Sequence, residues 1–319
     1  MALSILSIKD NVAGLLHILP FLFFPLADAA EENLITLSIL GVVQDAGYPQ
    51  AGCMAKHCIP AWEAPNLRRG ATSLAIIDAK KEATYLFEAT PNFPEQIYLL
   101  ETIAPDHQLS GIFLTHAHIG HYTGLMYLGH EAMATTNIPV YAMPRMKDFL
   151  LSNAPWSQLS EYENIKLRPL EADSEIKLGD VSITPFLVPH RDEFSETVGY
   201  KIKGPNRTAL FIPDINKWEL WERDIVDEIR IVDYAFIDAT FFSSGELPGR
   251  DMSKVPHPLV LESMKKFQTL RPIEKQKIFF IHMNHTNPLL DAESSASDIV
   301  QNKGFNIAND PVLPSIKKY

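Results

Sequence analysis

The chain has 319 residues, of which 46% are hydrophobic and 21% are charged, proportions that are ordinary for a soluble globular enzyme. This length accommodates one large domain or two small ones. Acidic residues outnumber basic ones, 39 to 28, and the formal net charge is −11. No run of lysine and arginine offers a footprint for a phosphate backbone, so we expect no nucleic acid among the partners.

An apolar stretch near the N-terminus predicts a secretory signal. Residues Val12–Leu26 are almost continuously apolar, contain Pro20 and Pro25, and precede the small-x-small sequence Ala27-Asp28-Ala29. The stretch is shorter than the roughly 20 apolar residues that a membrane-spanning helix needs. We therefore expect a signal peptide over residues 1–29, a mature domain over residues 30–319, no stable membrane insertion after processing, and a secreted or periplasmic location. An uncleaved anchor and a buried helix are the alternatives.

Two cysteines follow the first predicted strand. That strand, Leu34–Leu40, leads into the loop Gly41–Gly52, which is punctuated by glycine and proline. Cys53 and Cys58 come next, with His57 between them. In an exported protein two cysteines usually form a disulfide, which is the reading we favour. A structural zinc held by the cysteines and the histidine is the alternative.

The rest of the chain alternates apolar, strand-like runs with helical segments. The predicted strands are Ser73–Ile77, Thr84–Glu88, Ile112–Leu114, Pro139–Ala142, Val181–Val188, Val198–Lys203, Thr208–Ile212, Ala235–Ile237 and Lys277–Ile281. The predicted helices are Asn92–Ile103, His121–Met133, one that starts near Pro144, Trp218–Ile229 and Pro258–Phe267. Strands followed by helices in each half indicate the α/β class, with two sheets packed face to face and helices outside, a four-layer αββα sandwich.

Three of the 11 histidines gather directly after the predicted strand Ile112–Leu114. His116 and His118 are two residues apart, the spacing at which side chains of an extended segment share a face. Gly120 then breaks the extended path, so that His121 can begin a helix and turn toward the same point. Exposed loop histidines or hydrogen-bonded core histidines would explain one such residue more readily than three. We therefore predict a transition-metal site, with zinc expected first and iron or manganese as alternatives.

This His-x-His-x-x-His pattern, with a strand before it and Gly124-Leu125 after it, resembles the first metal motif of the metallo-β-lactamase superfamily. Members of that superfamily usually carry an aspartate where this chain has Gly120. The resemblance implies three further ligands, each following a predicted strand: His190, Asp214 and His282.

Asp214 also has an argument of its own. It ends a hydrophobic strand, and a buried acid at a strand end needs a compensating charge, which a metal supplies; capping of the next helix is the alternative. The superfamily uses this position to bridge two metals, so we expect Asp214 in a catalytic role. His285 is a second candidate for acid–base work, and an exposed loop histidine is the alternative reading.

Several short stretches narrow the resemblance to the pyrroloquinoline-quinone biosynthesis protein B family, over most of the chain after Leu34. They are Gly47–Gln50, the cysteine loop, Gly249–Met252 and Ile281–Asp291. The chain departs from that family in three respects. It keeps the two leading histidines and lacks the aspartate, it has Ala55 where the family has a third cysteine, and its predicted export contrasts with a cytoplasmic family.

Counting donors gives two metal positions. The first is formed by three imidazoles, those of His116, His118 and His190. The second is formed by the imidazoles of His121 and His282 and by the carboxylate of Asp214, which both metals share. Gly120 removes a ligand from the second position, so we expect unequal sites, with Asp45 or His285 as the substitute ligand. On this count Gly120→Asp would strengthen the second site.

The first functional hypothesis is a metal-dependent hydrolase of small esters, lactones or phosphodiesters. It uses one or two ions, and an ion with an open position lowers the pKa of its water to about 7. The rival is an oxidative enzyme, because histidines plus a carboxylate also suit non-haem iron and the family resemblance implies oxidative chemistry. A binding protein with a vestigial site is the third reading. We expect a small-molecule substrate and leave the oligomeric state open.

Overall fold

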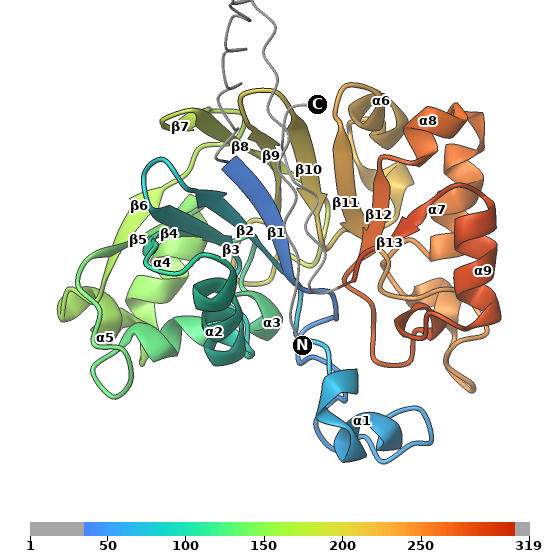
Figure 1. The fold of residues 1–319 in the computed structure, drawn as a ribbon, viewed down its shortest axis with the longest axis horizontal. Helices are drawn as coiled ribbons and strands as arrows, with labels where there is room; N and C mark the ends of the chain where they lie inside the picture. The colour runs from blue at the N-terminus through green and yellow to red at the C-terminus, as the bar shows by residue number, and fades with distance from the viewer. Residues whose placement is uncertain (1–34, 310–319) are drawn as a thin grey trace, which may run out of the picture. The chain divides into compact units, whose positions relative to one another are not determined.

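Two β-sheets form the centre of the computed structural model, which describes residues 35–309 (Figure 1). The first sheet has its strands in chain order: β1 (Ile35–Gly41), β2 (Ser73–Asp78), β3 (Ala83–Phe87), β4 (Gln108–Phe113), β5 (Ile138–Ala142) and β6 (Ile165–Pro169). The second sheet reverses the chain order: β13 (Asn306–Ile307), β12 (Ile278–Ile281), β11 (Tyr234–Asp238), β10 (Thr208–Ile212), β9 (Val198–Lys203), β8 (Val181–Leu187) and β7 (Ile176–Leu178).

Helices cover the outer face of each sheet, as Figure 1 shows. The first half contains α1 (Ile59–Glu63), α2 (Phe93–Ile103), α3 (Ile119–Tyr122), α4 (Pro144–Ser152) and α5 (Trp156–Glu161). The second half contains α6 (Ile225–Arg230), α7 (Val260–Lys266), α8 (Pro272–Lys275) and α9 (Ser295–Asn302). Apolar side chains of α2, α4 and α5 pack on the first sheet, and those of α7 and α9 pack on the second. The predicted αββα sandwich is confirmed.

Buried aromatic rings join the two sheets. The ring of Phe87 lies 5.3 Å from that of Tyr200 and 5.9 Å from that of Phe211, and Phe113 lies 5.8 Å from Tyr200. All four side chains are fully buried, and their tilted geometry is the one that aromatic pairs prefer. The backbone N–H of Val198 also donates to the carbonyl of Thr115, two residues after the end of β4, at 3.2 Å. The end of β4 is therefore held against the second sheet.

The region after β4 is less helical than predicted. In place of one helix over His121–Met133, the chain forms the single turn of α3 and then a 3₁₀ helix, η2 (Thr123–Leu128). Gly124 donates its N–H to the Ala89 carbonyl at 2.8 Å, and a Cβ at this glycine would lie only 2.2 Å from the carbonyl oxygen of Thr90. This close backbone packing replaces the α-helical path.

The predicted helix Trp218–Ile229 is likewise divided. It consists of a 3₁₀ turn, η3 (Trp218–Leu220), and then α6. The side chain of Asp224 accepts a hydrogen bond from Val226 N at 2.7 Å, so it caps a new helix start where the sequence pattern suggested continuation.

The predicted signal peptide, residues 1–29, lies outside the described residues. The described residues belong to one compact unit. In residues 35–309 no helix has the length and apolar character needed to cross a membrane. Cys53 and Cys58 form the favoured disulfide.

Candidate metal centre

The candidate ligands follow the carboxyl ends of strands that run in one direction. In the first sheet β3 and β4 are parallel, and β1 shares their direction because antiparallel β2 lies between β1 and β3. In the second sheet β10, β11 and β12 are parallel, and β8 shares their direction through antiparallel β9. Binding sites of such sheets form beyond the carboxyl ends of the strands. The polar residues placed there are Asp45, Glu88, His116, His118, His121, His190, Asp214, Asp238 and His282.

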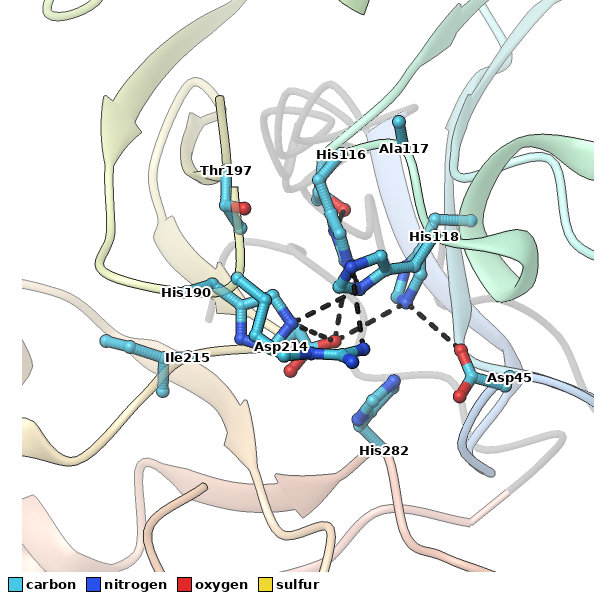
Figure 2. Close-up of polar contacts among 12 residues, drawn as sticks. Asp45, His116, Ala117, His118, His190, Thr197, Asp214, Ile215 and His282 are labelled. Atoms are coloured by element: carbon cyan, nitrogen blue, oxygen red, sulfur yellow. Dashed lines mark hydrogen bonds and ion pairs between the residues drawn. The ribbon is translucent and has the colours of Figure 1, made fainter. Parts of the chain in front are cut away.

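Four of these residues bring one donor atom each to a common point. His118 Nδ1 lies 2.8 Å from His116 Nε2 and 3.3 Å from His190 Nε2. Asp214 Oδ2 lies 3.4 Å from His116 Nε2 and 3.3 Å from His190 Nε2. Figure 2 shows the imidazoles around this carboxylate. Three imidazole nitrogens and one carboxylate oxygen within 4.8 Å of one another form a four-donor group that suits a transition metal.

A second donor group adjoins the first. It contains Asp45, His121 and His282, whose donor atoms also lie within 4.8 Å of one another. His121 Nε2 is 3.8 Å from Asp45 Oδ1 and 3.7 Å from Asp214 Oδ2, so Asp214 faces both groups. The Nε2 atoms of His121 and His282 are buried and have no hydrogen-bond partner within residues 35–309. Buried unpaired nitrogens are costly, and a metal ion would satisfy both.

The opposite ring nitrogens of four histidines contact polar groups that hold the rings in place. The pairs are His116 Nδ1 with Thr115 Oγ1 at 2.9 Å, His118 Nε2 with Glu193 Oε2 at 3.1 Å, His121 Nδ1 with Glu88 Oε1 at 3.1 Å, and His282 Nδ1 with Thr240 Oγ1 at 3.1 Å. Metal-binding histidines characteristically have such partners, which fix the ring orientation and the tautomer. Four of the five candidate histidine ligands are therefore held in a fixed orientation, whereas Nδ1 of the fifth, His190, has no hydrogen-bond partner among the described residues.

Burial and neighbouring carboxylates shift the pKa values of the histidines at the site in opposite directions. Burial lowers the pKa of His116 well below its ordinary value, and it also lowers the pKa of His282. Burial acts in the same direction on His121, but the carboxylates of Glu88, Asp214 and Asp45 together outweigh it and raise the pKa of His121 to about 9. His116 and His282 are thus neutral donors at neutral pH, whereas His121 releases a proton when it binds a metal.

Comparison with known proteins agrees with this geometry. A family model described as the Beta-lactamase superfamily domain matches residues 83–283, more than half of the chain. The chain belongs to the metallo-β-lactamase superfamily.

Both a curated relative and a solved structure that resemble this superfamily member are PQQ synthesis proteins B. The coenzyme PQQ synthesis protein B of Xanthomonas axonopodis pv. citri (strain 306) is 24% identical over 298 residues, which cover 85% of this chain and 97% of that protein. Zinc-bound PqqB from Methylobacterium extorquens matches with a TM-score of 0.73 at 20% identity, over 87% of this chain and 99% of that chain. A diphosphatase from the PhnP family matches with a TM-score of 0.60 at 20% identity, over 89% of this chain and 97% of that chain. The resemblance to PqqB is confirmed, and the solved structures establish the fold.

This superfamily member contains a further charged cluster that the sequence analysis missed. His257 Nδ1 lies 2.8 Å from Asp238 Oδ2 and 3.2 Å from Asp214 Oδ1. Although burial lowers the pKa of His257, the two carboxylates raise it to about 9. Asp238 could have been suspected, because it ends a hydrophobic strand as Asp214 does. His257 lies in a loop between two prolines and carries no comparable signal.

His285 lies away from the metal ligands of this superfamily member. Its ring is 5.5 Å from that of His57, and its donor atom groups with those of His57, Cys53 and Cys58. His57 Nε2 in turn lies 3.6 Å from Cys53 Sγ. The contacts of His285 therefore give no support to the catalytic role that the sequence suggested, or to its use as a substitute ligand in the second donor group.

Proposed function

We propose that this protein is a metal-dependent hydrolase of small anionic esters, with phosphodiesters as the first class to test. The observation that carries the proposal is the pair of donor groups that share Asp214. Two metals held a few ångströms apart clamp the attacking and the leaving oxygen of a displacement. Two adjacent donor groups with buried, unpaired nitrogens suit this arrangement better than they suit a binding protein with a vestigial site.

Metal ions held by these donors would supply a Lewis acid and lower the pKa of a water molecule to about 7. The residues of the chain have distinct roles around them. Asp214 positions the two sites relative to each other, because its Oδ2 faces His116, His190 and His121. We assign to His257, whose Nδ1 lies 2.8 Å from Asp238 Oδ2, the role of supplying the proton that the departing alcohol oxygen requires when water cleaves the ester bond.

An exposed guanidinium beside the first donor group supports an anionic substrate. Arg191 Nη2 lies 3.5 Å from His118 Nε2, and its side chain is 58% exposed. Its Nη1 is 3.8 Å from Glu193 Oε1, and an exposed ion pair of this kind is weak enough for an anion to displace. Nearby, Arg145 donates from Nη2 to the Asp192 carbonyl at 2.9 Å, which ties this loop to α4. A guanidinium beside the first donor group of a chain with net charge −11 is suited to bind a phosphate or carboxylate.

Oxidative chemistry with non-haem iron is the second candidate. The relatives of this chain are named coenzyme PQQ synthesis protein B, and a group of three imidazoles with one carboxylate also suits iron.

The test compares metals and substrates directly. The purified protein is stripped with a chelator, reloaded with zinc, manganese or iron, and assayed with bis(p-nitrophenyl) phosphate, a p-nitrophenyl ester and a lactone. We expect metal-restored hydrolysis that is at least about 1,000-fold weaker in His116→Ala and unchanged in His130→Ala, an exposed histidine that stacks on Tyr162. Oxygen consumption by the iron form, with no hydrolysis by any metal form, would favour the oxidative candidate instead.

We further propose that the protein is exported. The Cys53–Cys58 disulfide suits an oxidising compartment. N-terminal sequencing of the protein recovered outside the cytoplasm should begin at residue 30, and an intact N-terminus on cytoplasmic protein would contradict the proposal.

A further inference from the structure

Asp45 occupies the space that a side chain at position 120 would need. A Cβ atom at Gly120 would lie 2.4 Å from Asp45 Cα and 2.5 Å from Asp45 Oδ1. Real Cβ atoms do not approach other heavy atoms so closely, so no larger residue fits at position 120 while Asp45 stays in place. Position 120 therefore has no room for a side chain while residue 45 lies against it, and Asp45 presents its carboxylate to His121 from this place.

The loop that carries Asp45 is fixed to the strand end that carries a metal ligand. Met283 N donates to the Val42 carbonyl at 2.9 Å, and Gln44 N donates to the Met283 carbonyl at 2.8 Å. Met283 directly follows His282, so the loop after β1 is paired with the end of β12. Asp45 itself has φ of 42°, in the left-handed region that aspartate tolerates better than most residues. This backbone turn directs its carboxylate toward the second donor group (Figure 2).

We propose that Asp45 is the carboxylate ligand of the second metal, and that a glycine at position 120 is required because it leaves the space that Asp45 occupies. The inference rests on the metal centre of the proposed function and deepens it. The second site then has three donors of its own, from His121, His282 and Asp45, and Asp214 Oδ2 lies 3.7 Å from His121 Nε2. Asp45 also supplies the negative charge that position 120 does not.

This arrangement corrects the expectation drawn from the sequence for Gly120→Asp. Alone, that substitution would force its Cβ into Asp45 and disturb the ligand already there. Replacing Asp45 as well would not make room, because the nearest atom is the backbone Cα of residue 45, which every residue has. The test therefore changes each position singly.

The experiment measures zinc stoichiometry and affinity in the chelator-stripped full-length protein by calorimetry and elemental analysis. We expect two zinc ions per chain in the wild type. In Asp45→Asn the second zinc should bind at least about tenfold more weakly while the first is retained. Gly120→Ala, whose Cβ would meet the backbone of residue 45, should have the same effect. Asp106→Asn is the matched control, because Asp106 is an exposed aspartate that also has positive φ.

Two results would overturn the inference. One is a second zinc that binds Asp45→Asn as tightly as the wild type. The other is a folded Gly120→Ala variant, as judged by its thermal unfolding, that binds the second zinc as tightly as the wild type. Asp45→Asn preserves side-chain shape, so it decides the question even where Gly120→Ala fails to fold. Zinc binding is measured without turnover, so a protein that binds two ions through Asp45 and hydrolyses nothing would refute the proposed function alone.

Discussion

Replacing Glu88 with glutamine should weaken the second metal site and the fold together. Glu88 is fully buried, and its carboxylate contacts His121 Nδ1 at 3.1 Å while accepting hydrogen bonds from the backbone N–H and the hydroxyl of Thr115. Glutamine has the same shape but only one acceptor oxygen, so its NH₂ group must face a donor. Hydrogen bonds to a charged group contribute about 1.5–3 kcal/mol each, and we expect a loss of about 2–4 kcal/mol in the free energy of unfolding.

The same change releases His121 from its fixed orientation. Loss of a partner of this kind typically reduces metal affinity by about 10- to 100-fold, and we expect this at the second site. The loss at the first site should be smaller, because Glu88 contacts its ligand His116 only through Thr115. Titration of the stripped protein with zinc, together with denaturant unfolding, measures both effects. Glu82→Gln serves as the control, because Glu82 also has positive φ but is exposed. Unchanged zinc affinity and unchanged stability in Glu88→Gln would refute the reasoning.

Three other predictions concern pH, packing and the disulfide. Burial lowers the pKa of His257, but the carboxylates of Asp238 and Asp214 together raise it to about 9 from an ordinary 6.5. In the metal-stripped protein the stabilising contribution of His257 is therefore complete below pH 6.5 and is lost as the pH rises through 9. The melting temperature should fall more steeply over this range in the wild type than in His257→Asn, and parallel curves would contradict this. Gly124→Ala, whose Cβ would lie 2.2 Å from a carbonyl oxygen, should destabilise the protein by about 1–3 kcal/mol in denaturant unfolding, whereas Gly245→Ala, with no neighbour closer than 3.9 Å, should be neutral. Cys53→Ser should lower the free energy of unfolding by about 2 kcal/mol, because it removes the short disulfide loop. Wild-type protein unfolded without reductant should show no free thiol. Two free thiols released together with zinc would instead indicate the structural-zinc alternative.

The strands that carry the site were predictable because they are buried runs with abrupt ends. β8, β9 and β10 match their expected ranges to within one residue, and the ligands follow the strands as the sequence suggested. The edge strand β7 was missed because it has only three residues, and β6 because its side chains are mostly exposed. Helix ends were harder to predict, since the 3₁₀ path of η2 depends on Gly124 packing against residues about 35 positions earlier in the chain.

The residues of the site also divide into those that local sequence could predict and those that it could not. His116, His118 and His121 share one short motif, so their convergence is a local property that spacing can reveal. Glu88 and His257 reach the site from other strands and loops, and only the folded topology brings them there. The position of Asp45 could be suggested as a substitute but not distinguished from His285, because the choice depends on the pairing of residue 283 with the loop after β1.

Each donor group takes ligands from both halves of the sandwich. Asp45, His116, His118 and His121 follow strands of the first sheet, whereas His190, Asp214 and His282 follow strands of the second. A bound ion would therefore fasten one sheet to the other, and a ligand present at 100 times its Kd adds about 2.7 kcal/mol to folding stability. Metal starvation would then act on the protein twice. It would abolish metal-dependent activity, and it would also weaken the contact between the two sheets. Proteases could then degrade the protein before metal became available again.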